Sequence, residues 1–141
     1  ILQDQLKQVG IDVEVKTLEW GAYLDGTARG DHQMFILGWG TVTADPDYGI
    51  NNLVSTKTVG AAGNRSFYSN PEVDKLLEAG KTELDPEKRK DIYKQIQEII
   101  RRDIPMYMIV YPLQNVVTQK NIKNFKLDPA QGHKIYGVIK E

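Results

Sequence analysis

The stretch FILGWGTVTADPDYGIN, residues 35 to 51, decides the fold of this chain. It starts as an apolar run, places Trp39 between two glycines, and then enters a long loop that carries Asp45 and Asp47. An apolar run with little polar alternation is typical of a strand that is covered on both faces. The run QMFILGW, residues 33–39, therefore predicts a buried strand whose end opens directly into the loop.

The sequence before this strand supplies the other parts of a crossover unit. Residues 11–17, IDVEVKT, alternate apolar and polar side chains and predict a half-buried strand. Apolar side chains at helical spacing predict helices over residues 2–9 and 19–30, each closed by a glycine. Strand, helix and strand in succession indicate an α/β fold.

The region after the loop predicts two further helices. Residues 40–69 show no sustained periodicity, and a connection of that length is usually functional. Asn70 and Asp85 are each followed by a proline, the pattern of a helix N-terminus. The apolar side chains expected on the buried faces of these helices are Val73, Leu76, Leu77, Ile92, Ile96, Ile99 and Ile100.

The last part of the sequence returns to strand patterns. Residues 106–112, MYMIVYP, predict a buried strand, and shorter strands are expected within residues 122–127 and 134–140. The prediction is one α/β domain over residues 1–141, with a mixed sheet flanked by helices.

Composition excludes several classes of function. The net charge is −1 with acids interleaved among the bases, so a nucleic-acid partner is not expected. The longest apolar run, residues 105–113, is shorter than the ~20 residues that span a bilayer, so no membrane insertion is expected. The absence of cysteine excludes disulfides and thiol catalysis.

Catalytic and metal sites have little support. The two histidines, His32 and His133, lie far apart among polar turn residues, where a solvated structural role is predicted. Asp45, Asp47 and a distant histidine would offer a hard cation fewer oxygen ligands than its usual loops do. No metal, cofactor or catalytic residue is predicted.

The end of the strand over residues 33–39 has two interpretations. In the first, Trp39 is a core plug at an ordinary turn. In the second, Gly38 and Gly40 remove side chains so that the main chain of an extended, peptide-like ligand can approach beside the indole. Ligands of open α/β sheets gather beyond the carboxyl ends of the strands, where this loop begins.

Four ordered blocks carry a family resemblance: residues 18–49, residues 63–80 (GNRSFYSNPEVDKLLEAG), residues 85–100 (DPEKRKDIYKQIQEII) and residues 115–129 (NVVTQKNIKNFKLDP). Together they resemble the C-terminal part of the extracytoplasmic solute-binding proteins, family 5, of peptide and nickel ABC importers. The resemblance implies a type II periplasmic-binding-protein-like fold, of which this chain would be part of the C-terminal lobe. The opening helix without an N-cap likewise predicts an excised piece of a longer protein.

The resemblance also implies site residues. In peptide-binding members, the segment matching Gly38, Trp39 and Gly40 pairs with the ligand main chain, and the following loop helps to recognise the ligand's amino end. Several members place an aspartate where this sequence has Val42. Either Asp45 or Asp47 then meets the ammonium group, or the ligand differs. The sequence of the loop is similar to that of members that bind glutathione or short peptides.

Two candidates complete the predicted ligand-binding set. Thr41 belongs to residues 38–42, which are expected to contact the ligand at the end of the strand. Arg65 either points toward a ligand carboxylate or caps loop carbonyls and holds the long connection in place, and the structural role is favoured.

The leading hypothesis is a binding module, not an enzyme, located outside the cytoplasmic membrane in the periplasm or on a lipid anchor. It would capture peptides and deliver them to the permease of an ABC importer. The alternatives are a hydrolase that uses Asp45 and Asp47, a stand-alone interaction domain, or a binder of nickel or another metal complex. The chain alone is expected to bind peptide weakly and to be a candidate for self-association through uncovered apolar surface.

Overall fold

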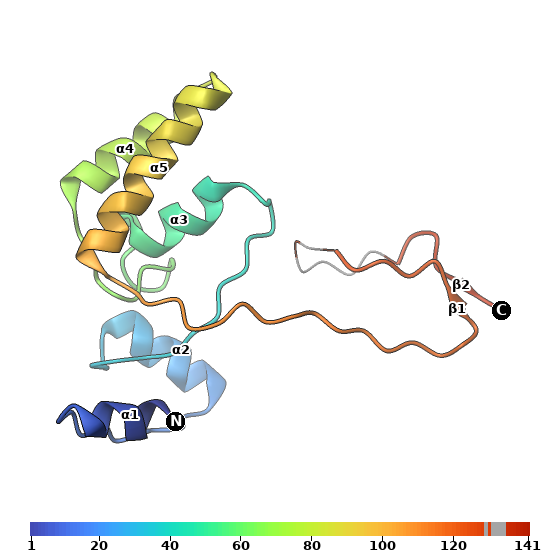
Figure 1. Cartoon of the computed structure of the whole chain (residues 1–141), viewed down its shortest axis with the longest axis horizontal. Coiled ribbons are helices and arrows are strands. Elements are labelled where there is room, and N and C mark those ends of the chain that lie inside the picture. Colours follow the sequence, from blue (N-terminus) through green and yellow to red (C-terminus); the bar gives the residue numbers. More distant parts are fainter. Residues whose placement is uncertain (129, 131–134) are drawn as a thin grey trace.

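The computed structural model describes residues 1–128, 130 and 135–141. Figure 1 shows a body of helices from which an extended arm, residues 107–128, leads away to a small ladder near the C-terminus. The elements are α1 (Leu2–Gln8), α2 (Trp20–Arg29), α3 (Pro46–Val54), the 3₁₀ helix η1 (Thr56–Thr58), α4 (Pro71–Thr82), α5 (Pro86–Asp103), β1 (Ile122–Lys123) and β2 (Ile139–Lys140).

Side-chain caps start the helices at the predicted positions. The Asn70 side chain accepts a hydrogen bond from the N–H of Glu72 at the start of α4. Asp85 accepts from two backbone N–H groups at the start of α5. Helix α2 ends at a C-terminal cap, where Gly30 adopts a left-handed φ of 83°. The four helices predicted from the sequence are therefore confirmed.

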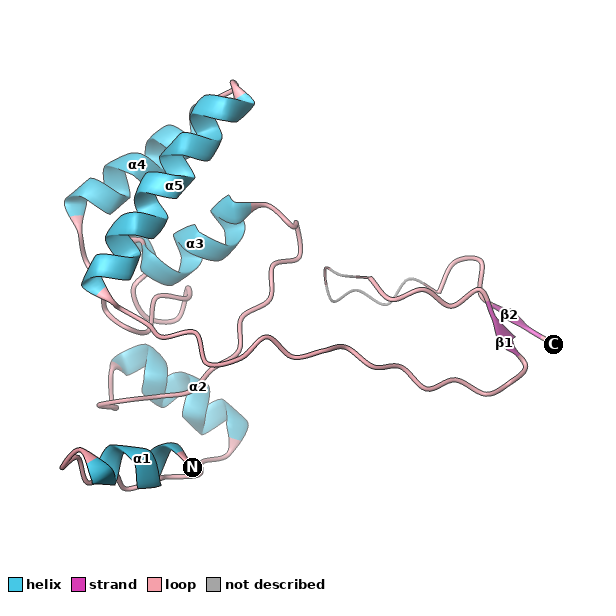
Figure 2. Cartoon of the chain, in the orientation of Figure 1, coloured by secondary structure: helices cyan, strands magenta, loops and turns pink. Residues whose placement is uncertain are grey.

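The core lies between α3, α4 and α5. Its buried side chains are Val54, Val73, Leu77, Tyr93, Ile96 and Ile99, and half-buried Ile50, Leu53, Leu76, Ile92 and Ile100 pack against them. The predicted buried faces of α4 and α5 are thus confirmed. In Figure 2 these two long helices lie side by side, with α3 crossing next to them.

The connection predicted over residues 40–69 contains a helix that the sequence analysis missed. Asp45 caps α3 by accepting from the N–H of Asp47, and Pro46 occupies the first turn. The apolar side chains Ile50, Leu53 and Val54 face the core. The start signal is the same aspartate and proline pair that begins α5, but only nine residues of helix follow it, too few for a clear period.

Three predicted strands do not pair in the structure. Within the described ranges, the only ladder is antiparallel, joining Ile122 to Lys140 and Lys123 to Ile139. Residues 11–17, 33–39 and 106–112 belong to no ladder. A strand exists only through hydrogen bonds to a neighbour, and in this chain these segments have none, whatever their own propensity.

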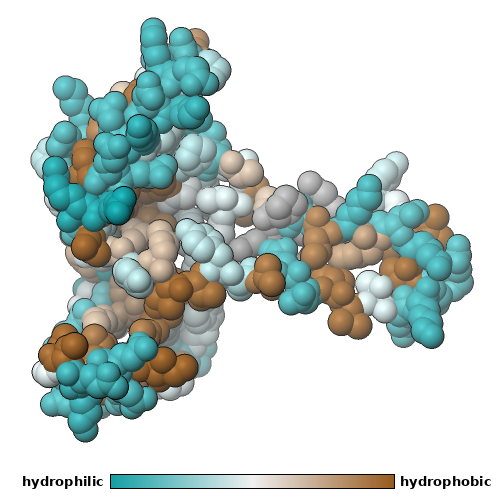
Figure 3. Space-filling view, viewed as in Figure 1, coloured by the Kyte–Doolittle hydropathy of each residue, from teal (hydrophilic) through white to brown (hydrophobic). Residues whose placement is uncertain are grey.

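The burial predicted for two of these segments is also wrong. Met34 and Ile36 are 58% and 68% exposed, whereas Phe35 and Leu37 are half-buried, so residues 33–39 are covered on one side only. Along the arm, Tyr107 and Tyr111 are 83% and 85% exposed. Figure 3 shows apolar groups following the arm away from the body. No helix within the described part of the chain is both long and apolar enough to cross a membrane.

Candidate ligand-binding edge

The open edge, residues 38–42, keeps its main chain free of backbone partners. Among residues 1–128, 130 and 135–141, no backbone–backbone hydrogen bond outside the helices and the ladder involves residues 33–44. Gly38 is exposed, and a Cβ built on it would meet no atom within 4 Å. The main chain here can therefore be approached by another extended chain.

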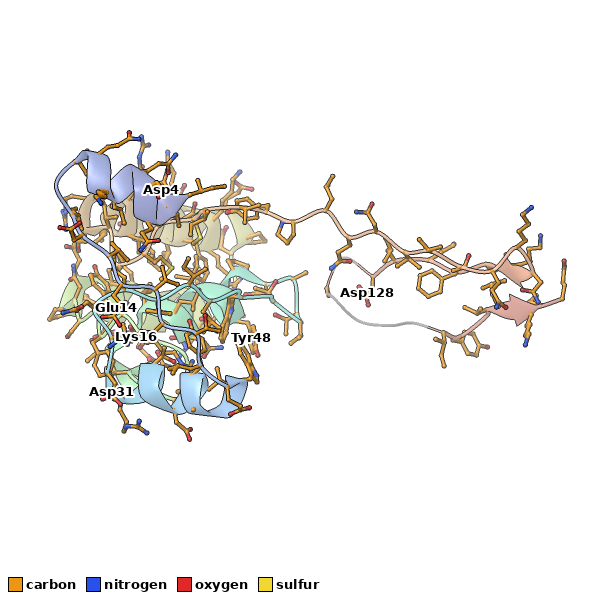
Figure 4. All side chains as sticks on the ribbon, turned by 90° about the horizontal axis from the view of Figure 1, so that it is seen from below. Asp4, Glu14, Lys16, Asp31, Tyr48 and Asp128 are labelled. Atoms are coloured by element: carbon orange, nitrogen blue, oxygen red, sulfur yellow. The ribbon has the colours of Figure 1, made fainter. Side chains whose placement is uncertain are left out.

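An aromatic pair stands beside the open edge. The ring of Trp39 stacks on that of Tyr48 from α3, with centroids 6.1 Å apart and planes 28° from parallel. The two residues are 38% and 37% exposed. Figure 4 shows Tyr48 on the side of the helical body nearer to the arm. Because the indole is neither sealed in the core nor loose, it can provide an apolar wall next to the open main chain.

Asp45 is held by α5. Arg89 reaches it with two nitrogens, Nη1 to Oδ2 at 3.0 Å and Nη2 to Oδ1 at 2.8 Å, in the bidentate geometry of a guanidinium and a carboxylate. These bonds from Arg89, together with the N–H of Asp47, lower the pKa of Asp45 below its usual value. Asp45 is therefore ionised and already engaged at the entrance to α3.

Asp47 is held by the same helix. The hydroxyl of Tyr93 donates to Oδ1 of Asp47 at 3.1 Å. Burial of Tyr93, reinforced by the negative charge of Asp47, raises the pKa of the phenol to about 12. Tyr93 is 3% exposed and fits only because α4 has Gly80 opposite its ring, where a Cβ would lie 3.0 Å from Cζ.

The remaining predicted residues, Thr41, Val42 and Arg65, have separate surroundings. Val42 is 65% exposed, and half-buried Thr41 packs so closely on α3 that a Cβ on Gly49 would lie 2.8 Å from its methyl group. Arg65 donates from Nε to Oγ1 of Thr27 at 3.1 Å, which ties its loop to α2.

Asn64, which the sequence analysis did not single out, organises the loop between α3 and α4. It is fully buried, and its Nδ2 donates to the carbonyls of Ser55 and Tyr68 at 2.9 and 2.8 Å. Its Oδ1 accepts from the hydroxyl of Ser66 at 3.0 Å. These partners lie within nine residues of Asn64 along the chain, but nothing in the loop sequence indicates that this polar side chain is buried.

The histidines take no part in this site. His32 is half-buried against Phe35, with ring centroids 4.7 Å apart, and its Nδ1 is buried without a hydrogen-bond partner. The prediction of a solvated role is therefore wrong for His32, because this nitrogen is shielded from solvent. His133 lies outside the described residues.

Two surface hollows occur elsewhere on the body. One lies between α1 and residues 12–14, and the other lies between Pro46 and the face of α5 that carries Lys90 and Lys94. Residues 38–42 line neither hollow. The open edge is thus a bare length of main chain with an aromatic neighbour, suited to hydrogen bonding and apolar contact rather than to covalent chemistry.

Comparisons with known proteins place this geometry in context. Residues 1–61 match the family described as bacterial extracellular solute-binding proteins, family 5 Middle. The whole chain is 28% identical to di/tripeptide-binding protein 3 of Pseudomonas aeruginosa and covers 26% of its length.

Solved structures agree with the predicted fold class. The chain is 33% identical to the periplasmic binding protein DppA of Helicobacter pylori in complex with the peptide STSA, with a TM-score of 0.87 over 99% of this chain and 28% of that protein. It is 26% identical to the dipeptide-binding protein of Pseudoalteromonas sp. SM9913 in complex with Met-Leu, again with a TM-score of 0.87 over 99% and 28%. The predicted fold class, α/β as part of a type II periplasmic-binding-protein-like fold, is confirmed, and within the described residues its sheet is one two-stranded antiparallel ladder.

The chain spans about a quarter of the length of these relatives, which are binding proteins by name. The match to the solute-binding family 5 model is confined to residues 1–61, whereas the likeness to peptide-binding proteins extends over the whole chain.

Proposed function

We propose that this chain is a segment of an extracytoplasmic receptor that captures short peptides for an ABC importer. One observation carries the proposal: the main chain of residues 38–42 has no backbone partner within the described residues and lies beside the exposed pair Trp39 and Tyr48. A peptide supplies the two things that this edge lacks, a neighbouring row of amides and apolar side chains.

The charges near the edge favour capture over hydrolysis. Asp45 and Asp47 are engaged by Arg89 and Tyr93, so neither is a free carboxylate that could act as a general acid or base on a ligand. The engagement also means that a ligand ammonium would compete with a guanidinium for Asp45. Recognition by main-chain hydrogen bonds and by the indole is therefore the main contribution that we assign to this segment.

The wider role that we propose is supported by the likeness to peptide-binding proteins and goes beyond this chain. The segment would belong to the C-terminal lobe of a receptor at the outer face of the cytoplasmic membrane, in the periplasm or on a lipid anchor. Two lobes would close around the peptide by a hinge motion, and the permease would recognise the closed form. Glutathione is included among the short peptides, and a nickel or other metal complex is the competing ligand class.

A titration of the intact protein tests the proposal. Calorimetry with di-, tri- and tetrapeptides, glutathione and a nickel complex should give binding to one or more of the peptides. The same peptides should be recovered uncleaved after long incubation. Binding of the metal complex alone, or release of cleavage products, would overturn the assignment.

A single substitution links the binding to the open edge. Gly38→Val places a branched side chain in open space, so the free energy of unfolding should stay within about 0.5 kcal/mol of wild type. The same side chain would stand where a ligand backbone must approach, so peptide affinity should fall about tenfold or more. Equal affinity of the two proteins would show that the peptide binds elsewhere.

A further inference from the structure

Helix α5 holds the N-terminal turn of α3 at two neighbouring points. Arg89 grips Asp45 across 44 residues of sequence, and Tyr93, one turn further along α5, donates to Asp47. The guanidinium is itself fixed, because its Nε donates to the carbonyl of Gly80 at 2.9 Å and its Cζ lies 4.9 Å from the centre of the Tyr93 ring. These contacts give the start of α3 a defined position.

Outside α3, the residues that lead into the open edge are held by α2, where the hydroxyl of Tyr23 donates to the carbonyl of Ile36 at 2.7 Å. Within the part of the chain that the structure describes, residues 33–44 make no backbone–backbone hydrogen bond. The N–H of Asp45 bonds to Oγ1 of Thr43 at 3.3 Å, and the ring of Tyr48 stacks on Trp39. Both of these contacts pass through the first turn of α3. The orientation of the indole therefore depends on where α5 holds that turn.

We propose that Arg89 is a positioning residue for the open edge: through Asp45 and the first turn of α3, it sets the orientation of Trp39. Among the described residues, the hydrogen bonds of Arg89 go to Asp45, Tyr93 and the carbonyl of Gly80, and none goes to residues 38–42. The effect of Arg89 on peptide affinity rests on the proposed function. Its effect on the orientation of Trp39 does not depend on that function.

The shape of the guanidinium explains why an arginine occupies this place. Its planar fork meets both oxygens of Asp45 while Nε remains free for the Gly80 carbonyl. A lysine could supply the charge but only one point of contact. The side chains of Arg89 and Asp45 are 27% and 42% exposed, so solvent weakens the attraction between their charges. The bidentate geometry of the contact therefore contributes more than the charge of Arg89 to holding Asp45 in place.

The first test reads Trp39 directly, without a ligand. The intact protein is labelled with 5-fluorotryptophan, and its fluorine NMR signal for Trp39 is assigned by its loss in Trp39→Phe. In Arg89→Gln this signal should shift and broaden. In Arg89→Lys its chemical shift should lie between those of wild type and Arg89→Gln. Lys57→Gln, which breaks the exposed 2.8 Å ion pair with Glu78, is the matched control and should leave the signal unchanged.

The second test measures peptide affinity at a temperature where circular dichroism shows every variant to be folded. Arg89→Gln should weaken binding about tenfold, Arg89→Lys less, and Lys57→Gln not at all. In a double-mutant cycle, Arg89→Gln with Asp45→Asn should bind no worse than the weaker single variant, because both remove the same contact.

The outcomes separate the two proposals. A Trp39 signal that is unchanged in Arg89→Gln overturns the positioning role, whatever the protein binds. A shifted signal in a protein that binds no peptide supports the positioning role and overturns the proposed function. A loss of affinity that is equal in Arg89→Gln and Lys57→Gln indicates general destabilisation and also overturns the positioning role.

Discussion

The phenol of Tyr68 donates a 2.5 Å hydrogen bond to the carboxylate of Asp103, which lies 35 residues later at the last turn of α5. Asn70 donates to the same oxygen at 2.9 Å, and Nε of Arg102 donates to the other at 2.9 Å. One carboxylate thus ties the residues that lead into α4 to the end of α5. This network closes the opposite end of the helix pair from the one that holds Asp45 and Asp47.

The network predicts a loss of stability in acid. The hydrogen bond from Tyr68, followed by those from Arg102 and Asn70, lowers the pKa of Asp103 to about 2. The pKa of this carboxyl group in the folded state lies below its unfolded pKa of about 4, so the ionised group stabilises the fold fully above about pH 4. This stabilisation is lost as the pH falls through the folded-state pKa. Urea unfolding of wild type and Asp103→Asn should therefore differ at pH 6 and converge toward pH 2. A difference that stays constant over this range would contradict the assignment.

Tyr68 predicts the alkaline counterpart. Burial, together with the bond to Asp103, raises the pKa of its phenol to about 12. The folded state therefore favours the protonated phenol, and this stabilisation is present below about pH 10 and is lost as the pH rises toward 12. Tyr68→Phe should lower the free energy of unfolding at pH 7 by about 1 kcal/mol.

An ultraviolet titration of tyrosinate checks the same point. Wild type should contain a late-titrating phenol that Tyr68→Phe removes. The control is Tyr136→Phe, because Tyr136 is fully exposed and its removal should leave the stability unchanged. The pKa of the Tyr93 phenol is also raised to about 12, so Tyr93 should remain as a second late-titrating group in both variants.

Gly80 and Gly26 predict opposite effects of the same substitution. Alanine favours a helix over glycine by about 1 kcal/mol. At Gly80 the added methyl group would lie 3.0 Å from the ring of Tyr93, which is buried and bonded to Asp47. Gly80→Ala should therefore lower the free energy of unfolding by about 1–2 kcal/mol, the typical effect of overpacking.

Gly26 is the matched control in α2, where the nearest atom to an added Cβ is an Asp31 carboxylate oxygen at an ordinary 3.9 Å. Gly26→Ala should raise the free energy of unfolding by about 0.5–1 kcal/mol. Urea unfolding measures both variants. If Gly80→Ala were the more stable of the two, the contact between α4 and Tyr93 would be looser than the structure has it.

Local signals explain what the sequence predicted well. The helices that begin at Pro71 and Pro86 carry their caps and their apolar period within a single stretch, so no distant contact is needed to recognise them. α3 carries the same cap at Asp45 but only nine residues of helix. The segments over residues 11–17 and 33–39 have strand propensity, yet pairing depends on a neighbour that lies outside their own sequence.

The candidate site was predicted in part for the same reason. Glycines on both sides of Trp39 and two aspartates after it mark the open edge locally, and the role of these residues toward a ligand remains a prediction. The side chains that hold the loop, Arg89 and Tyr93, lie more than 40 residues away on α5. In the sequence they belong to a charged helix face and an apolar stripe, and only the fold brings them to Asp45 and Asp47.

The arm predicts self-association of the chain when it is made alone. Residues 104–119 contain no charged side chain, and residues 105–118 make no backbone–backbone hydrogen bond within the described ranges. Apolar side chains with free main-chain groups on both sides form an unprotected strand edge. A second arm can satisfy these groups without bringing like charges together, so light scattering after size exclusion should give a mass that rises with concentration.

Lysine on the arm should suppress this association, because charge on an exposed edge opposes pairing. Val110 is 72% exposed and makes no contact with the core cluster, so Val110→Lys should return the chain toward a monomer without changing its helical content. Leu84→Lys is the control, since Leu84 is 93% exposed but lies on the helical body between α4 and α5. Equal suppression by both variants would mean that association depends on overall charge or on the body; suppression by Val110→Lys alone would locate it on the arm.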